Sequence, residues 1–177
     1  MKLIKDIFVE SNHIILPKRL SSEIYSEALS SLIIVCADAV IVSREKKSIF
    51  LAKRIVSPMK GYWTIGGRRF AGETSIDAVR RNFHRETGIL SEESRFHFLT
   101  SIEVIWKDRF EFPNNKGKHD LIQFFSIYLN ENEIIEANKN LLLSEYEAMS
   151  LVSFNLEELI KYQVNPIMHQ IYNTIFP

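Results

Sequence analysis

The stretch GGRRFAGETSIDAVRRNFHRETGI (residues 66–89) combines glycines, arginines and carboxylates in an order suited to phosphate chemistry. Gly66 and Gly67 carry no side chain, so a ligand can approach the backbone there and meet its carbonyl groups. Glu86 adds a carboxylate, and five arginines crowd the same region: Arg68, Arg69, Arg80, Arg81 and Arg85. Guanidinium groups and a metal ion held by a carboxylate can share the charge of a diphosphate. The stretch therefore predicts a site for a diphosphate bridged by a divalent cation.

Helix signals inside this stretch indicate how its carboxylate is positioned. Thr74 is a suitable N-cap, and Asp77 three residues later completes a capping box. Gly88 supplies a left-handed stop, so the pattern predicts a helix over residues 75–87. At about 100° per residue, Glu86 falls at the edge of the apolar stripe of that helix. A carboxylate at such an edge can face a cleft.

The same residues resemble the Nudix box, a motif written G-x5-E-x7-R-E-U-x-E-E-x-G-U, in which U is an apolar residue. The positions that match are Gly67, Glu73, Arg81, Phe83, Glu86, Gly88 and Ile89. Asn82 and Arg85 stand where the motif has two of the three helix glutamates that usually bind metal, and Glu86 matches the third. The resemblance implies a Nudix hydrolase, an α+β protein built as an α/β/α sandwich around a central mixed β-sheet.

Within that superfamily the chain is most similar to the GDP-mannose mannosyl hydrolase branch, which also lacks those two glutamates. The flanking stretch LAKRIVSPMKGYWTIGGR resembles that branch as well, and the resemblance covers roughly residues 31–160. It implies that Arg54 and Arg68 contact the diphosphate and act in catalysis, and that Asp38 lies at the same site. Tyr62 is predicted to be either a core residue or a wall of the pocket, and we include it among the substrate-binding residues.

The resemblance also implies a bound Mg2+ or Mn2+ ion. Its predicted ligands come from three residues: the carbonyl of Gly67, Glu86 and Glu147. Glu147 stands where the mannosyl hydrolases carry a metal-binding Gln, and Ala148 stands where their general-base His would be. Another residue must then act as the base. His119 is our candidate, with Asp120 as a second, and both belong to the polar stretch KDRFEFPNNKGKHD, which we expect to be a loop.

Three functions are compatible with these residues. The first is hydrolysis of a nucleoside diphosphate sugar between the anomeric carbon and oxygen. Asn82 and Arg85 cannot act as carboxylate ligands, and attack on phosphorus usually needs a metal-activated water near a second carboxylate. The second is an ordinary Nudix pyrophosphatase acting on another nucleoside diphosphate derivative. The third, favoured by Ala148 and Arg85, is a catalytically impaired nucleotide-binding protein.

Runs of apolar residues bounded by turn signals predict the elements that must position this site. The expected strands lie at residues 31–43, 48–54, 101–106 and 121–129, and the expected C-terminal helices lie within residues 155–162 and 165–176. Residues 1–30 form an N-terminal extension with one or two short strands and a helix beginning after Pro17, available for a dimer contact. Residues 31–177 form the Nudix hydrolase domain.

Composition limits the partners and the setting. Lys and Arg together number 22, as do Asp and Glu, so the net charge gives no reason to expect a nucleic acid as partner. Cys36 is the only cysteine and excludes an internal disulfide. No apolar run is long enough for a membrane span, and we expect a cytoplasmic protein. The expected partner is a small nucleoside diphosphate derivative, and the resemblance implies a homodimer.

Overall fold

The structure is a computed structural model that describes residues 14–177. Its centre is a seven-stranded sheet in the order β3-β2-β1-β6-β5, with β4 paired to β1 and β7 paired to β2. The strands are β1 (Ile34–Ser43), β2 (Ser48–Arg54), β3 (Gly61–Trp63), β4 (Ile65–Arg68), β5 (His97–Trp106), β6 (Lys118–Tyr128) and β7 (Val152–Phe154). β1 and β6 are parallel, whereas the other pairs are antiparallel. The predicted α+β class with a mixed sheet is confirmed.

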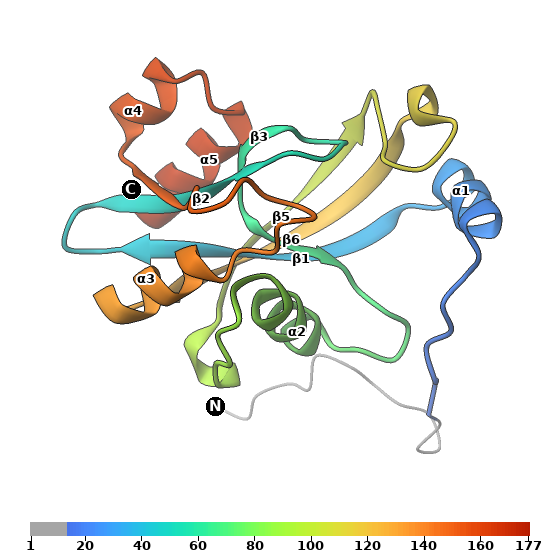
Figure 1. Cartoon of the computed structure of the whole chain (residues 1–177), viewed down its shortest axis with the longest axis horizontal. Coiled ribbons are helices and arrows are strands. Elements are labelled where there is room, and N and C mark those ends of the chain that lie inside the picture. Colours follow the sequence, from blue (N-terminus) through green and yellow to red (C-terminus); the bar gives the residue numbers. More distant parts are fainter. Residues whose placement is uncertain (1–13) are drawn as a thin grey trace.

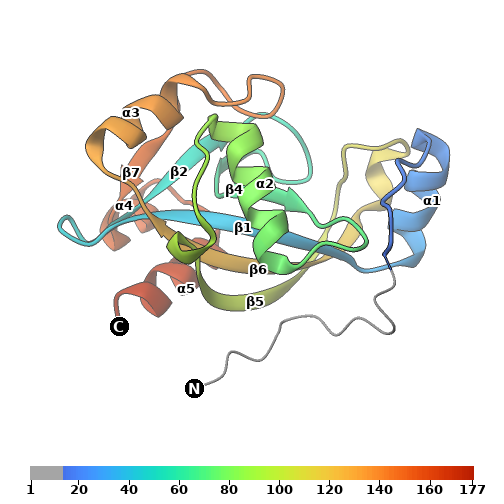
Figure 2. The same cartoon turned by 90° about the horizontal axis from the view of Figure 1, so that it is seen from below.

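Helices lie on both faces of this sheet and at one end of it (Figure 1). They are α1 (Ser22–Ser31), α2 (Ser75–Thr87), α3 (Glu131–Lys139), α4 (Leu156–Lys161) and α5 (Pro166–Ile175). Figure 2 shows α1 at the end of the molecule away from α3, next to the loop that joins β5 to β6. Within residues 14–177, no helix is both long and apolar enough to cross a membrane.

β1 is the strand on which both layers of the core are built. Seven consecutive residues of it are buried, because helices cover both faces of the sheet at this strand. Its alternate residues enter two different clusters. One cluster joins β1 to α2 through Ala37, Ala39, Val79 and Phe83, and the other joins it to α5 through Val40, Val42, Met168 and Ile171. The result is the expected α/β/α sandwich.

α2 forms where its local signals predict it. The Thr74 hydroxyl accepts from the backbone N–H of Asp77 at 3.1 Å, and the Asp77 carboxylate accepts from the backbone N–H of Thr74. The helix ends at Gly88, whose φ of 73° lies in the left-handed region. Val79 and Phe83 are fully buried against β1. α2 therefore holds the carboxyl-terminal half of the box against the sheet.

The N-terminal extension differs from its prediction. Its helix begins at Ser22 and not directly after Pro17, because the Ser21 hydroxyl caps it by accepting from the N–H of Ile24 at 3.4 Å. Residues 14–20 have no regular secondary structure. The rest of the predicted N-terminal strands lies outside the described residues.

Beyond the box, one prediction needs correction and one helix was missed. β6 begins at Lys118, so His119 and Asp120 belong to a strand and not to the polar loop; backbone pairing with β5 continues as far as Trp106 opposite Lys118. α3 was not predicted, although Asn130 and Glu133 form a capping box at its start. The two C-terminal helices are confirmed.

Gly66 and Gly67 offer a matched test of the close packing between β4 and β1. A Cβ atom on Gly66 would lie 2.5 Å from the backbone Cα of Asp38. One on Gly67 would lie 3.3 Å from the end of the Arg85 side chain and in ordinary contact with Asn82 at 3.5 Å. Gly66→Ala should lower the free energy of unfolding by about 1–3 kcal/mol or more. Gly67→Ala should change it far less. Urea unfolding of both variants measures the difference, and equal losses would contradict this packing.

Candidate active site

A cavity of about 420 Å3 opens where the box meets the sheet. β1 contributes Asp38 to its lining, β4 contributes Gly67 and Arg68, and β6 contributes Asp120. The segment before β7 contributes Glu145. Residues far apart in the sequence thus converge on one space, and its volume lies within the range of about 300–1,000 Å3 typical of small-molecule sites.

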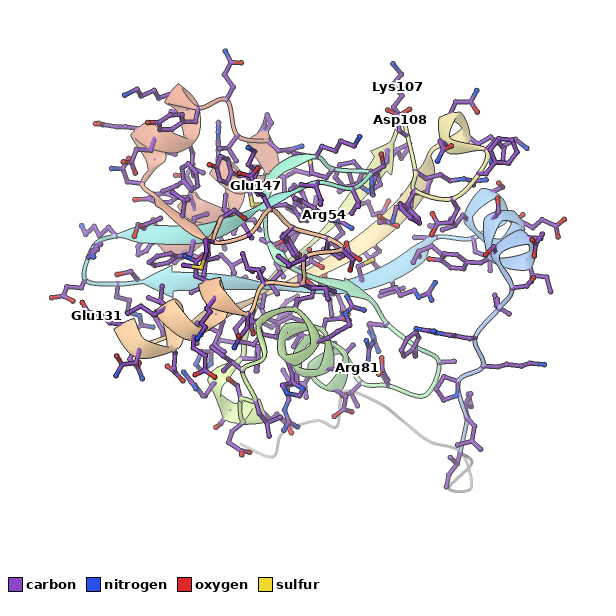
Figure 3. The ribbon with its side chains drawn as sticks, in the orientation of Figure 1. Arg54, Arg81, Lys107, Asp108, Glu131 and Glu147 are labelled. Atoms are coloured by element: carbon purple, nitrogen blue, oxygen red, sulfur yellow. The ribbon has the colours of Figure 1, made fainter. Side chains whose placement is uncertain are left out.

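Arg81 fixes the shape of the box loop. Its guanidinium donates to both carboxylate oxygens of Glu73, at 2.5 and 2.8 Å, and to the carbonyl of Arg68 at 3.1 Å. Glu73 also accepts from the backbone N–H of Phe70 at 2.8 Å. Arg81 belongs to α2, where Figure 3 labels it, and it does not line the cavity. Glu73 and Arg81, which both match the box, therefore stabilise the loop by bonding to each other and not by binding a ligand.

Asn82 satisfies the carbonyl that was predicted to bind metal. The side chain is fully buried, and its Nδ2 donates to the Gly67 carbonyl at 2.8 Å. Its Oδ1 accepts from Arg81 at 2.7 Å. The amide thus fills the position of the motif glutamate with internal hydrogen bonds.

Glu86 is buried beneath the box, and both of its oxygens have partners. One oxygen accepts from the guanidinium of Arg85. The other accepts from the hydroxyl of Tyr146 at 2.6 Å and from the backbone N–H of Gly66 at 3.1 Å. Burial raises the pKa of Glu86 to about 7, against the opposing effects of the Arg85 charge and the Tyr146 hydrogen bond. Glu86 is thus a carboxyl group balanced between its two protonation states near neutral pH.

Glu147 is not where a third metal ligand should be. Its carboxylate pairs with Lys53 at 2.7 Å, is half-exposed and does not line the cavity; Figure 3 shows it on the segment before β7. Glu145 lines the cavity instead and pairs with Arg54 at 2.8 Å. Lys53 and Arg54 are neighbours on β2, so their side chains point to opposite sides of the strand. Their partners Glu147 and Glu145 therefore also lie on opposite sides.

The residues present do not fit the metal centre that the resemblance implies. Within residues 14–177, no three His, Cys, Asp or Glu side chains gather as a metal-binding group. Arg85 pairs with Glu86, the Asn82 amide donates to the Gly67 carbonyl, and Lys53 pairs with Glu147. Each expected ligand has a partner from the protein itself. A cation would have to displace them.

The other predicted residues divide between those inside the cavity and those outside it. Arg54, Arg68 and Asp38 line it, and Asp38 accepts from Trp63 Nε1 at 3.2 Å and from the Thr64 hydroxyl at 2.7 Å. Burial raises the pKa of Asp38, although these hydrogen bonds oppose the shift.

His119 and Tyr62 do not line the cavity. Because alternate residues of β6 face opposite sides, His119 points away from it and lies 3.5 Å from Glu103, while Asp120 lines it. The Tyr62 ring packs edge-on against Phe154 with centroids 4.7 Å apart.

Several cavity residues were not predicted from the sequence. They are Tyr25, Lys118, Glu145 and Tyr146. Lys118 pairs with Asp120 at 2.8 Å, and burial, which alone would lower its pKa, is outweighed by that carboxylate, so the pKa is raised. Lys118 therefore remains a cation inside the cavity. Alternation along KHDLI would have placed Lys118 and Asp120 on one face, had β6 been extended to Lys118.

Glu86 should make stability depend on pH. Its pKa of about 7 lies above the ordinary value of 4.5, so the folded protein holds this proton more tightly than the unfolded chain. Its contribution is complete below about pH 4.5 and is lost as the pH rises through 7. The wild type should lose on the order of 2–3 kcal/mol more than Glu86→Gln between pH 5 and pH 8.

Denaturant unfolding in the presence of EDTA measures this difference. Glu131→Gln on the exposed start of α3 is the control and should keep the wild-type profile. Parallel pH profiles for the wild type and Glu86→Gln would show that Glu86 does not titrate in this range.

Comparisons with known proteins agree with this fold. The NUDIX domain family model matches residues 34–174. A MutT NUDIX hydrolase from Burkholderia pseudomallei is 25% identical, with a TM-score of 0.57 over 73% of this chain and 88% of its own. A NUDIX hydrolase from Nitrosomonas europaea is 16% identical, with a TM-score of 0.56 over 81% of this chain and 88% of its own.

An Ap4A hydrolase from C. elegans is 17% identical, with a TM-score of 0.56 over 81% of this chain and 95% of its own. The last two proteins share the fold at low identity. No curated protein matches the chain significantly. None of these findings supports the narrower resemblance to GDP-mannose mannosyl hydrolases. The family match spans most of the sheet, the box and the C-terminal helices, and the chain therefore belongs to the NUDIX domain family.

Proposed function

We propose that this Nudix domain binds a nucleoside diphosphate derivative in the cavity and hydrolyses it. One observation carries the proposal: four cationic side chains line the cavity beside the buried carboxyl of the Nudix box. They are Arg54, Arg68, Arg85 and Lys118. Three of them already have carboxylate partners: Arg54 pairs with Glu145, Lys118 with Asp120 and Arg85 with Glu86. Arg68 stays available to a ligand.

The arginines suit a diphosphate because their planar donors can bind two oxygens at once. Arg54 keeps a buried Nε that has no hydrogen-bond partner among residues 14–177. An unsatisfied buried donor is unfavourable, and a phosphate oxygen would satisfy it. Arg85 lines the same cavity, is 44% exposed in its side chain and is paired with Glu86.

For the substrate and the bond, we propose a nucleoside diphosphate sugar cleaved between the anomeric carbon and its oxygen. The oxygen of water would join the carbon, and the electron pair of the broken bond would leave on the diphosphate. Arg54 and Arg68 would stabilise that leaving charge. The proton of the water needs an acceptor, and Asp120, Asp38 and Glu145 are the candidates to replace His119, since all three line the cavity.

Asn82 and Arg85 support this assignment of the bond. With an amide and a guanidinium at those positions, a carboxylate cluster able to activate water against phosphorus is hard to assemble. Mg2+ or Mn2+ is the cofactor that family membership suggests, since Nudix hydrolases generally use such ions. The step described here relies on the side chains of the protein alone.

Two other functions each have an observation in their favour. An ordinary pyrophosphatase, acting on another nucleoside diphosphate derivative, is favoured by membership of the NUDIX family. A nucleotide-binding protein without turnover is favoured by the Arg85–Glu86 pair, which neutralises the remaining box carboxylate. The homodimer and the cytoplasmic location remain predictions, the former supported by the exposed apolar side chains of Ile14, Leu16 and Leu20.

One experiment separates the three functions. The protein is incubated in 18O-labelled water with nucleotide sugars, dinucleotides and nucleoside triphosphates, with and without Mg2+, and the products are analysed by mass spectrometry. We expect 18O on the free sugar and none on the nucleoside diphosphate. Arg54→Gln should lower kcat/KM at least about 100-fold, on the scale of removing a group that stabilises developing charge. Arg44→Gln, at the exposed turn after β1, is the matched control.

Label on a phosphate group would contradict cleavage at carbon and favour the pyrophosphatase. Binding without any product, with Arg54→Gln weakening that binding, would favour the protein without turnover. Binding of none of these nucleotides would overturn all three functions.

A further inference from the structure

We propose that α1, which precedes the segment matched by the family model, forms one wall of the active cavity and positions Arg68 for the phosphates through Tyr25. This inference rests on the proposed function, in which Arg68 contacts the diphosphate. The family match begins at residue 34, so nothing assigned to the Nudix domain includes α1. Tyr25 nevertheless lines the same cavity as Arg68.

The contact between Tyr25 and Arg68 carries the inference. The guanidinium carbon of Arg68 lies 4.2 Å from the centroid of the Tyr25 ring and 5.6 Å from that of Phe70. A guanidinium held over an aromatic face keeps its donors free at its edge. Arg68 thus contacts one ring from α1 and another from the box loop. Its side chain is ordered before a phosphate arrives, which reduces the entropy lost on binding.

A second observation explains what holds Tyr25 in place. Arg109, in the loop between β5 and β6, is only 1% exposed, and no Asp or Glu within residues 14–177 pairs with it. Its guanidinium donates to the hydroxyls of Ser26 at 2.7 Å and Ser30 at 3.0 Å, both on α1. It also donates to the carbonyls of Glu111 at 3.3 Å and Gly117 at 3.4 Å. Burying a charge is unfavourable unless its donors are satisfied, and α1 supplies half of these acceptors.

The attachment of α1 depends heavily on this arginine. Leu29 is the one residue of the helix that is buried, so apolar packing contributes little. Ser26 adds one more hydrogen bond, from its hydroxyl to the carbonyl of Phe112 at 2.6 Å. Ser26 follows Tyr25 directly, and Ser30 lies about one turn further along. Arg109 therefore fixes the part of α1 that carries the Tyr25 ring.

A double-mutant cycle tests whether Tyr25 acts through Arg68. The dissociation constants of ADP, GDP, UDP and CDP are measured by calorimetry for the wild type, Tyr25→Ala, Arg68→Ala and the double variant. Tyr25→Ala should weaken binding of the preferred nucleotide by about 2- to 30-fold, the range expected for a lost cation–π contact. In the Arg68→Ala background it should weaken binding no further. Tyr25→Phe keeps the ring and should bind as the wild type does.

The outcomes distinguish this inference from the proposed function. If the wild type binds none of the four nucleotides, the proposed function fails and takes the role of Tyr25 with it. If the wild type binds, but Tyr25→Ala has no effect or an equal effect with and without Arg68, the positioning role alone is overturned.

Arg109→Met tests the attachment separately. Amide hydrogen exchange in residues 22–31 should become faster, and nucleotide binding should weaken by about the same factor as in Tyr25→Ala. Unchanged exchange in α1, or faster exchange with unchanged binding, would contradict the link between Arg109 and the cavity.

Discussion

The buried carboxyl group of Glu86 is the constraint on which the rest of the site depends. A carboxylate in this position needs a cation or strong donors, because water does not reach it. In this chain the partners are Arg85, Tyr146 and the backbone of Gly66. These contacts connect α2, the segment before β7 and β4, so one buried carboxyl group joins three elements around the cavity.

Replacement of two motif glutamates by Asn82 and Arg85 changes the charges and hydrogen bonds around Glu86. Asn82 donates to the carbonyl of Gly67, and Arg85 brings a positive charge to Glu86. Both changes remove negative charge from the box and satisfy its remaining acceptors from within. At the position of a motif glutamate, which would attract cations, the cavity has the cationic side chain of Arg85. It becomes a site that can hold anionic phosphates by side chains of its own.

The parts of this arrangement that local sequence determines were predictable. The capping pair Thr74 and Asp77 and the stop at Gly88 define α2 without help from distant residues. Apolar runs on either side of a charged turn predicted β1 and β2, and the spacing of Glu73 and Arg81 identified the box.

What could not be predicted depends on contacts between distant segments. Glu145, and not Glu147, reaches the cavity because the N–H of Ile55 donates to the carbonyl of Glu145 at 2.9 Å and fixes the register of that segment against β2. His119 turns away because β6 is longer than its apolar run suggests. The hydrogen bonds from Arg109 to α1 join residues more than 75 positions apart, and no local sequence pattern predicts them.

The central claim is that Arg85 takes the place of a divalent cation beside Glu86, and Mn2+ binding tests it most directly. Mn2+ is titrated into the wild type and Arg85→Glu, and free Mn2+ is followed by electron paramagnetic resonance. The partly exposed position of Arg85 lets glutamate replace it without opening a cavity. Arg85→Glu should bind Mn2+ at least about tenfold more tightly than the wild type, the scale on which single changes near a metal alter its affinity. Equal affinity in the two proteins would show that the guanidinium does not occupy the place of the metal.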